Sequence, residues 1–212
     1  VAEGKIEGFN SKEYPKRAIR GAFATAENST LNLRRIEQGL DQINRLGTHR
    51  ASMELVPGKE IGGSVIDLQT QITRPLSVDL RLDNTGQDTT GEAQLGLTVN
   101  WANPFGILDF LSISTGRQLE NVGDNIFSRS ASLHYDAPLG YWNFDIDVSW
   151  FTYSLEIDSF ASTFVSSGVS RNQSFRTSRL LHRNQNSKSG VRVTLGRKQS
   201  LNFVEDVRVD TS

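Results

Sequence analysis

The sequence predicts a small α+β module followed by the antiparallel strands of a transmembrane β-barrel. Residues 1–74 combine a helical apolar period with short apolar strands, whereas residues 75–212 repeat an alternation of apolar and polar residues. The alternating segments are joined by connections that are short and long in turn, which is typical of outer-membrane barrels. We therefore expect two structural units, with their boundary near Arg74 and Pro75.

The clearest strand signal lies between Trp142 and Trp150. This segment reads WNFDIDVSW, so its aromatic and aliphatic side chains share one face and its polar side chains share the other. A strand that crosses a bilayer at a tilt needs about 9 to 11 residues, with aromatic rings near both interfaces and polar groups toward a wet lumen. An amphipathic strand of a soluble β-sandwich would show the same alternation, and this segment alone does not separate the two.

The alternation returns in neighbouring segments, which favours the barrel. Small or polar residues repeatedly oppose the apolar ones, where a sandwich surface normally carries more charge. The predicted strands cover residues 77–83, 92–101, 109–117, 129–135, 142–150, 170–181 and 190–196. The residues expected to face the lumen are Gln94, Asn100, Asn143, Asp145 and Asp147. These groups could line the path of a client chain, or they could pair with Arg117, Arg129, Arg192 or Arg197 to stiffen the barrel.

The connections between these strands have two lengths. Short turns are expected at Asn103-Pro104-Phe105-Gly106 and Ala137-Pro138-Leu139-Gly140, each with Pro two positions before Gly. Longer polar stretches cover residues 84–91, 119–127 and 159–173. An odd number of strands does not close a bacterial barrel, which takes an even number of eight or more. We therefore expect further strands outside this chain.

The first unit has a helical period. Leu33, Ile36, Leu40 and Ile43 form one apolar stripe, which predicts a helix over residues 33–46 with Asn32 as its N-cap. A second helix is expected over residues 16–25, with Pro15 in its first turn. Strands are expected at 4–9, 51–56 and 64–72. The order strand, helix, helix, strand, strand describes a compact α+β module.

Composition excludes several classes of function. The 212 residues carry a net charge of -1, so they offer no basic surface for nucleic acid, and the absence of cysteine excludes disulfides and thiolate metal sites. No run of about 18 apolar residues predicts a transmembrane helix. The three histidines are scattered and no Gly-x-Ser-x-Gly elbow is present. We expect neither an enzyme nor a bound metal or cofactor.

Several motifs together carry a family resemblance. The first unit contains LRRIEQGL at 33–40, INRL at 43–46, LVPG at 55–58 and GGS at 62–64. It resembles the membrane-proximal POTRA domain of two-partner secretion transporters. The continuation, with LDNTG at 82–86 and NPFG at 103–106 before Asp109, is similar to the first barrel hairpins of the same family.

The resemblance implies a pore of about sixteen strands in the bacterial outer membrane, with POTRA domains in the periplasm. Such a pore recognises the N-terminal secretion domain of one exoprotein, which is a haemolysin, an adhesin or a contact-dependent inhibition toxin. It exports this partner without nucleotide, and the sequence contains no GxxxxGK[ST] phosphate loop. Lipid and lipopolysaccharide would surround the barrel. The alternatives are a barrel-assembly insertase of the same superfamily and a soluble β-sandwich binding module.

Partner binding is expected at the edge of the POTRA sheet. An exposed edge strand presents unpaired backbone groups to which an extended client can add as a further strand. The strand 51–56 is our candidate, with the polar face of helix 33–46 as a neighbouring wall. An ordinary solvated helix face is the competing interpretation of that wall. The candidate residues are Arg34, Glu37, Gln38 and Arg45 on the helix, and Ala51, Ser52, Met53, Glu54, Leu55 and Val56 on the strand.

Overall fold

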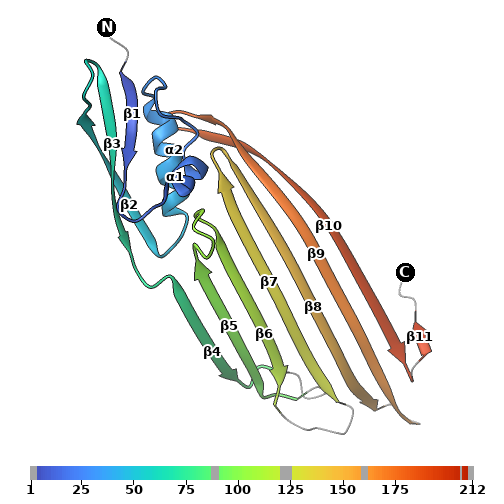
Figure 1. Cartoon of the computed structure of the whole chain (residues 1–212). Helices are drawn as coiled ribbons and strands as arrows, with labels where there is room; N and C mark the ends of the chain where they lie inside the picture. The colour runs from blue at the N-terminus through green and yellow to red at the C-terminus, as the bar shows by residue number, and fades with distance from the viewer. Residues whose placement is uncertain (1–3, 87–90, 120–125, 159–161, 206, 210–212) are drawn as a thin grey trace.

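The computed structural model describes residues 4–86, 91–119, 126–158, 162–205 and 207–209. It contains a three-stranded sheet with two helices, followed by an eight-stranded antiparallel sheet (Figure 1). The predicted order of an α+β domain and then barrel-type strands is confirmed. Within the described ranges, no helix has both the length and the apolar character needed to cross a membrane.

The N-terminal domain comprises β1 (Lys5–Asn10), α1 (Lys16–Ala22), α2 (Leu33–Asn44), β2 (His49–Pro57) and β3 (Gly63–Ile72). Its sheet has the order β1-β3-β2, in which β1 runs parallel to β3 and β2 antiparallel to it. β3 is therefore central, and β2 lies at one edge of the sheet.

Side-chain and backbone caps determine where the helices begin and end. The Asn32 side-chain oxygen accepts from the amides of Arg34 (3.0 Å) and Arg35 (3.3 Å), which confirms this residue as the N-cap of α2. Pro15 was expected in the first turn of α1. It is instead the N-cap of this helix, because its backbone is extended. α1 ends at Ala22, earlier than predicted, because Phe23 turns to an extended conformation.

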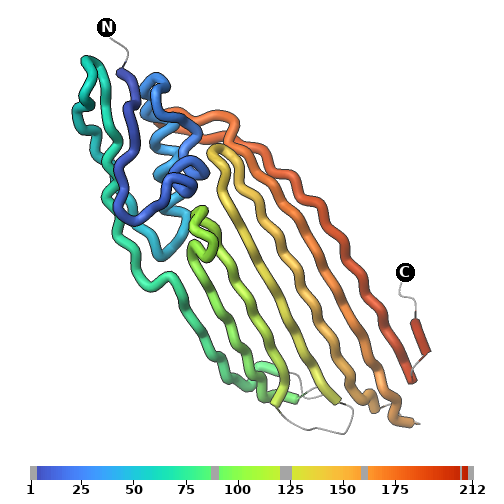
Figure 2. Tube along the Cα trace, viewed as in Figure 1, coloured from blue at the N-terminus to red at the C-terminus, as the bar shows by residue number. Residues whose placement is uncertain are grey.

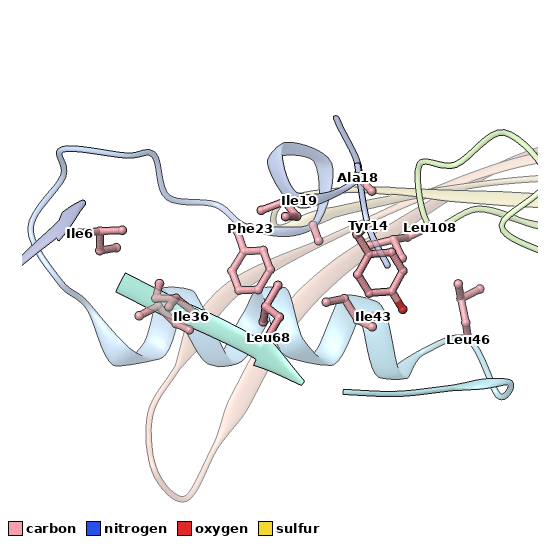
Figure 3. Close-up of a cluster of buried hydrophobic side chains, with 12 residues drawn as sticks. Ile6, Tyr14, Ala18, Ile19, Phe23, Ile36, Ile43, Leu46, Leu68 and Leu108 are labelled. Carbon is pink, nitrogen blue, oxygen red and sulfur yellow. The ribbon is translucent and has the colours of Figure 1, made fainter. Parts of the chain in front are cut away.

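One apolar cluster joins both helices of this domain to its sheet (Figure 3). Ile36 and Ile43 of α2 are fully buried, as the helical stripe predicts, and so is Ile66 of β3. Leu33, the first residue of the predicted stripe, is instead 48% exposed. The cluster also contains Leu108, which lies in the turn between β5 and β6 of the second sheet. The core of the N-terminal domain is therefore completed by a residue from the neighbouring unit.

The second sheet is a single layer of slanted strands with the order β11-β10-β9-β8-β7-β6-β5-β4 (Figure 2). Every neighbouring pair in it is antiparallel. Its strands are β4 (Leu76–Asp83), β5 (Gln94–Ala102), β6 (Phe110–Gln118), β7 (Phe127–Leu139), β8 (Trp142–Asp158), β9 (Thr163–Arg183), β10 (Lys188–Val204) and β11 (Val207–Val209). β4 and β11 are its two edges, so in this chain the sheet is an open strip.

Two expectations about these strands were wrong, and one strand was not predicted. The loop predicted at 159–173 is mostly strand, because β9 begins at Thr163 and pairs in unbroken register with β8. Ala137, Pro138 and Leu139 belong to β7, so the chain turns at Gly140 and Tyr141. The short strand β11 was missed. Parts of the predicted connections 84–91 and 119–127 lie outside the described residues.

The two faces of the second sheet differ sharply in polarity. Directly opposed residues of an antiparallel pair share a face. One row across the sheet is Leu76, Trp101, Leu111, Tyr135, Ile146, Phe175 and Leu195. The next row, on the other face, is Ser77, Asn100, Ser112, His134, Asp147, Ser174 and Gly196. No second sheet covers the apolar face in the described part of the chain, where Leu195 is 66% exposed, so a sandwich is excluded there.

Gly39 tests the packing of α2 against α1. A Cβ atom at this buried position would lie 2.2 Å from the Phe23 ring, which is itself only 3% exposed. We expect Gly39→Ala to lower the melting temperature of the N-terminal domain, although Ala favours a helix by about 1 kcal/mol over Gly. Thermal unfolding followed by circular dichroism measures this. Gly47→Ala is the matched control, because no atom lies within 4 Å of its Cβ position; equal melting temperatures for the two variants would contradict the packing argument.

Candidate functional site

The β5–β6 turn forms the centre of the junction between the two sheets. Leu108 in this turn has 0% exposure and adopts a left-handed backbone with φ of 65°. This conformation costs about 1 kcal/mol for a non-glycine residue. The Asn103 side-chain oxygen supports it by accepting from the Leu108 amide at 2.7 Å. The turn therefore holds one leucine in an unfavourable conformation that places it inside the neighbouring core.

Asp109 organises the same turn from within. Its carboxylate is fully buried and accepts from the backbone amides of Phe105 (3.3 Å) and Ile107 (3.4 Å). The Tyr135 hydroxyl of β7 donates to it at 3.2 Å. A buried carboxylate needs such donors to offset its lost hydration. Asp109 thus fixes the turn that presents Leu108.

Arg45, at the C-terminal end of α2, crosses from the N-terminal domain to the second sheet. Its guanidinium donates to the Leu108 carbonyl at 2.7 Å and forms an ion pair with Asp136 of β7. Burial lowers the pKa of the Arg45 guanidinium, and the nearby carboxylates of Asp145 and Asp109 oppose this shift. Arg45 therefore belongs to the junction and not to an exposed wall for a client.

The polar face of α2 contacts the β9–β10 hairpin. Arg183 of β9 donates to Asp41 (2.5 Å) and Glu37 (3.2 Å), and Lys188 of β10 donates to Asp41 at 2.6 Å. Gln38 is buried and also lies within hydrogen-bond distance of Arg183. The prediction that this helix face is free to form a groove wall is therefore corrected for Glu37 and Gln38, because they bind the second sheet.

The β7–β8 turn also contacts the helices, through Gly140. The Gly140 amide donates to the Gly21 carbonyl of α1, and the Gln42 side chain of α2 donates to the Gly140 carbonyl at 3.0 Å. Gly140 has φ of 58°, and a Cβ atom there would lie 3.3 Å from the Ala24 Cβ atom. The turns at 103–109 and 140–141 thus contact the helices of the N-terminal domain, as do Arg183 and Lys188 on either side of the β9–β10 turn.

The candidate client-binding strand, residues 51–56, is part of β2 at the edge of the N-terminal sheet. Asn44 bonds both backbone groups of Ala51: its side-chain oxygen accepts from the amide at 2.7 Å and its side-chain nitrogen donates to the carbonyl at 3.0 Å. Since alternate residues of an edge strand direct their backbone groups outward, Met53 and Leu55 face the same edge as Ala51. Ser52, Glu54 and Val56 pair with β3 in an unbroken register.

All five residues expected in the lumen share one face of the second sheet. Gln94 and Asn100 lie on β5, and Asn143, Asp145 and Asp147 lie on β8, with the same parity as the polar row. Of the arginines proposed as their partners, Arg117, Arg129 and Arg197 lie on the opposite, apolar face. The cation beside Asp145 and Asp147 is Arg176 of β9, with a closest nitrogen-to-oxygen distance of 3.9 Å to each.

His134 bridges two carboxylates on this polar face. Its Nδ1 atom lies 2.7 Å from Asp147 and its Nε2 atom 3.4 Å from Asp136, which also binds Arg45. A neutral imidazole carries one N–H and donates to only one of them, whereas an imidazolium donates to both. A continuous polar chain thus runs from the N-terminal domain through Asp136 and His134 to Asp147. Neither Arg176 nor His134 was expected, because their partners become visible only with the strand register.

Leu108 should stabilise the junction by packing alone. Leu108→Ala removes buried methyl groups from a core that cannot fully collapse, at a cost of about 2–5 kcal/mol. We expect faster proteolysis between the two units and a lower melting temperature of the N-terminal domain. Phe105→Ala is the control, since this neighbour in the same turn is 62% exposed. If both variants behave alike, Leu108 does not carry the junction.

The ion pairs of α2 make the junction sensitive to acid. Hydrogen bonds from Arg34 and Arg183 hold the pKa of Glu37 below its ordinary value; burial raises the pKa of Asp41, but bonds from Arg183 and Lys188 outweigh this and leave it lowered. Lowered pKa values mean that the stabilisation is complete above the ordinary carboxyl range and is lost as the pH falls below about 4.

We therefore expect constant protease resistance of the junction from pH 8 to 5 and a decrease below about pH 4, measured with an acid-tolerant protease. Asp41→Asn should weaken the junction at neutral pH and reduce its acid dependence. An equally steep acid transition in this variant would exclude Asp41 as a cause.

Comparison with known proteins agrees with this architecture. Residues 62–212 match the family of haemolysin secretion/activation proteins ShlB/FhaC/HecB, and residues 5–57 match the POTRA domain. The outer membrane transporter CdiB-2 of Burkholderia pseudomallei is 33% identical over 90% of this chain and 33% of its own length. The haemolysin transporter protein ShlB of Serratia marcescens is 30% identical over 100% of this chain and 38% of its own length.

The same likeness holds in three dimensions. The solved structure of CdiB from Escherichia coli superimposes with a TM-score of 0.88 at 31% identity, covering 98% of this chain and 39% of that chain. This chain therefore spans between 33% and 39% of the length of these three relatives. With the family match extending over residues 62–212 and a POTRA domain before it, the chain belongs to the ShlB/FhaC/HecB family of haemolysin secretion/activation proteins.

Proposed function

We propose that the full-length protein is an outer-membrane pore that exports a secreted partner protein in two-partner secretion, with its POTRA domain in the periplasm. The observation that carries this proposal is the second sheet, whose apolar face is uncovered and whose polar face continues into the junction with the POTRA domain. An uncovered apolar face of this extent, opposite a polar face on the same strands, is what a barrel presents to lipid, and a polar face lets a chain pass without adhering.

The apolar face is the surface we assign to lipid acyl chains. Val78, Leu80 and Leu82 of β4 are 61%, 72% and 68% exposed, and they follow one another along one face of the strand. At the end near the POTRA domain, the Arg179 guanidinium lies over the Trp142 ring, 5.0 Å from the ring centroid. Aromatic and basic side chains together are typical of membrane interfaces, and at this periplasmic end they would meet lipid phosphates.

The polar face is the surface we assign to the path of the client. Gln94, Asn100, Asn143, Asp145 and Asp147 line it in this proposal. The ion pairs with Arg176 and the contact with His134 also brace β8 against its neighbours, so the same side chains would serve both roles. No catalytic step, nucleotide or metal is part of this proposal.

The edge of β2 is the surface we assign to client recognition. Because Asn44 already occupies the outward groups of Ala51, an added strand would pair with Met53 and Leu55. Leu55 is 43% exposed, so its side chain remains accessible beside that edge. The alternating side chains of the client would supply specificity, while backbone hydrogen bonds would supply affinity.

A proline at Leu55 tests this edge without breaking the sheet. Proline removes the outward amide of residue 55, whereas the β2–β3 ladder uses the amides of Ser52 and Glu54. In the full-length protein, we expect Leu55→Pro to weaken partner binding at least about tenfold, or roughly 1.4 kcal/mol, and to reduce secretion of the partner as a result. Secretion is scored by immunoblotting the culture medium.

Leu55→Ala is the matched control, because it removes the side chain but keeps the amide. It should secrete better than Leu55→Pro, and both barrels should remain heat-modifiable on gels. Normal secretion by Leu55→Pro would refute strand addition at this edge. A general loss of outer-membrane barrels, with secretion lost only as a consequence, would instead favour an insertase.

A further inference from the structure

The POTRA domain has a recessed surface that includes no residue of the β2 edge. It is a cavity of about 800 Å³ between α1, the start of α2, and the segment 24–29. Phe9, Ile19 and Phe23 form its apolar floor, and the rings of Phe9 and Phe23 lie 4.8 Å apart. This volume is within the range that holds small ligands or a short peptide segment.

The rim of this cavity is positively charged. Lys16 and Arg20 lie one turn apart on α1, Arg35 lies in the first turn of α2, and all three are exposed. Among the described residues, none of these three cations has a carboxylate within ion-pair distance, and Glu27 is the one acidic residue in the lining. Three unpaired cations over an apolar floor attract a ligand that carries both carboxylates and apolar groups.

The walls of the cavity are held in place before any ligand binds. The segment 24–29 is tied to β1, since the Ile6 amide donates to the Ser29 carbonyl at 2.9 Å and the Asn28 amide to the Ile6 carbonyl at 2.7 Å. The hydroxyls of Thr25 and Ser29 bond each other at 2.8 Å. Asn32 already caps the first amides of α2, so positive charge must come from the side chains. A preformed site loses less entropy on binding.

The position of α1 connects this cavity to the mouth of the second sheet. Lys16 and Arg20 line the cavity, while Arg17 donates to the Gly106 carbonyl and Gly21 accepts from the Gly140 amide. One short helix therefore carries the cationic rim on one side and the contacts with two barrel turns on the other. A segment held in the cavity would lie beside the turns that border the polar face.

We propose that this cavity binds an acidic, partly apolar peptide segment of the exported partner, which places a second client contact next to the barrel mouth. The inference rests on the proposed function for the identity of the partner. Apolar side chains of the segment would contact Phe9 and Phe23, and its carboxylates would pair with Lys16, Arg20 and Arg35. Because these cations are exposed, binding should weaken as ionic strength rises.

Peptide binding to the purified full-length protein in detergent tests the site directly. The probe is a fluorescein-labelled decapeptide that alternates glutamate with leucine and valine, and its glutamine counterpart measures the contribution of charge. Fluorescence anisotropy should show the glutamate peptide binding at least tenfold more tightly to the wild type. Equal affinities for the two peptides would overturn the proposal.

Charge variants locate the binding. The double variant Lys16→Glu/Arg20→Glu should lose at least tenfold in affinity, whereas Lys12→Glu/Lys59→Glu, with the same change in net charge outside the cavity, should bind as the wild type does. Glu27→Lys should bind more tightly, a gain that misfolding cannot produce. Unchanged binding by Lys16→Glu/Arg20→Glu, or equal losses in both double variants, would refute this location.

Secretion then separates this inference from the proposed function. If Lys16→Glu/Arg20→Glu loses both peptide binding and partner secretion, the occupant is the partner. If it loses peptide binding but secretes normally, the partner is not the occupant and the inference fails, while export itself stands. If the wild type secretes no partner under any condition, the proposed function fails, whatever the peptide result.

Discussion

The arrangement of the two sheets depends on the insertion of Leu108 into the POTRA core. Neither unit completes its packing alone: the helices leave a space at the end of their apolar cluster, and the β5–β6 turn fills it. In this turn Leu108 adopts an unfavourable left-handed backbone. The buried Asp109 carboxylate stabilises the turn by accepting hydrogen bonds from three donors. A shared core is harder to separate than an ion pair on the surface, so the POTRA domain has a defined orientation on the barrel strands.

Ion pairs and hydrogen bonds around Leu108 fix how α2 is oriented on the second sheet. Arg45 binds the carbonyl of Leu108 itself and also Asp136, and Arg183 reaches back from β9 to Glu37 and Asp41. Glu37 and Asp41 lie in the middle of α2 and Arg45 directly follows its last residue, so the second sheet holds the helix from its middle to its C-terminal end. Through Asp136, the junction continues to His134 and Asp147 on the polar face. A tilt of the POTRA domain would therefore disturb side chains inside the strand layer.

Because Glu37, Gln38 and Arg45 of α2 bind the second sheet, the surfaces that we propose for a client lie at the β2 edge and at the cavity beside α1, which only the start of α2 borders. The edge of β2 offers backbone groups at Met53 and Leu55, and the cavity beside α1 offers charge and an apolar floor. The two surfaces use different chemistry, which would suit a client that passes from one to the other. The cavity adjoins the barrel turns through α1, so the order of contacts would run from the sheet edge toward the pore.

Local patterns in the sequence determined most of the elements and the two faces of the second sheet. The alternation from Trp142 to Trp150 and the stripe from Leu33 to Ile43 depend only on the periods of strand and helix, and Asn32 acts within its own helix. Only the tertiary structure decided which surfaces are occupied. Arg45, Glu37 and Gln38 look like solvated helix residues until distant Asp136 and Arg183 are placed beside them, and Leu108 looks like a turn residue until a second core surrounds it. Contacts between residues so far apart in the chain leave no periodic signal, because register and docking, and not local backbone preference, bring them together.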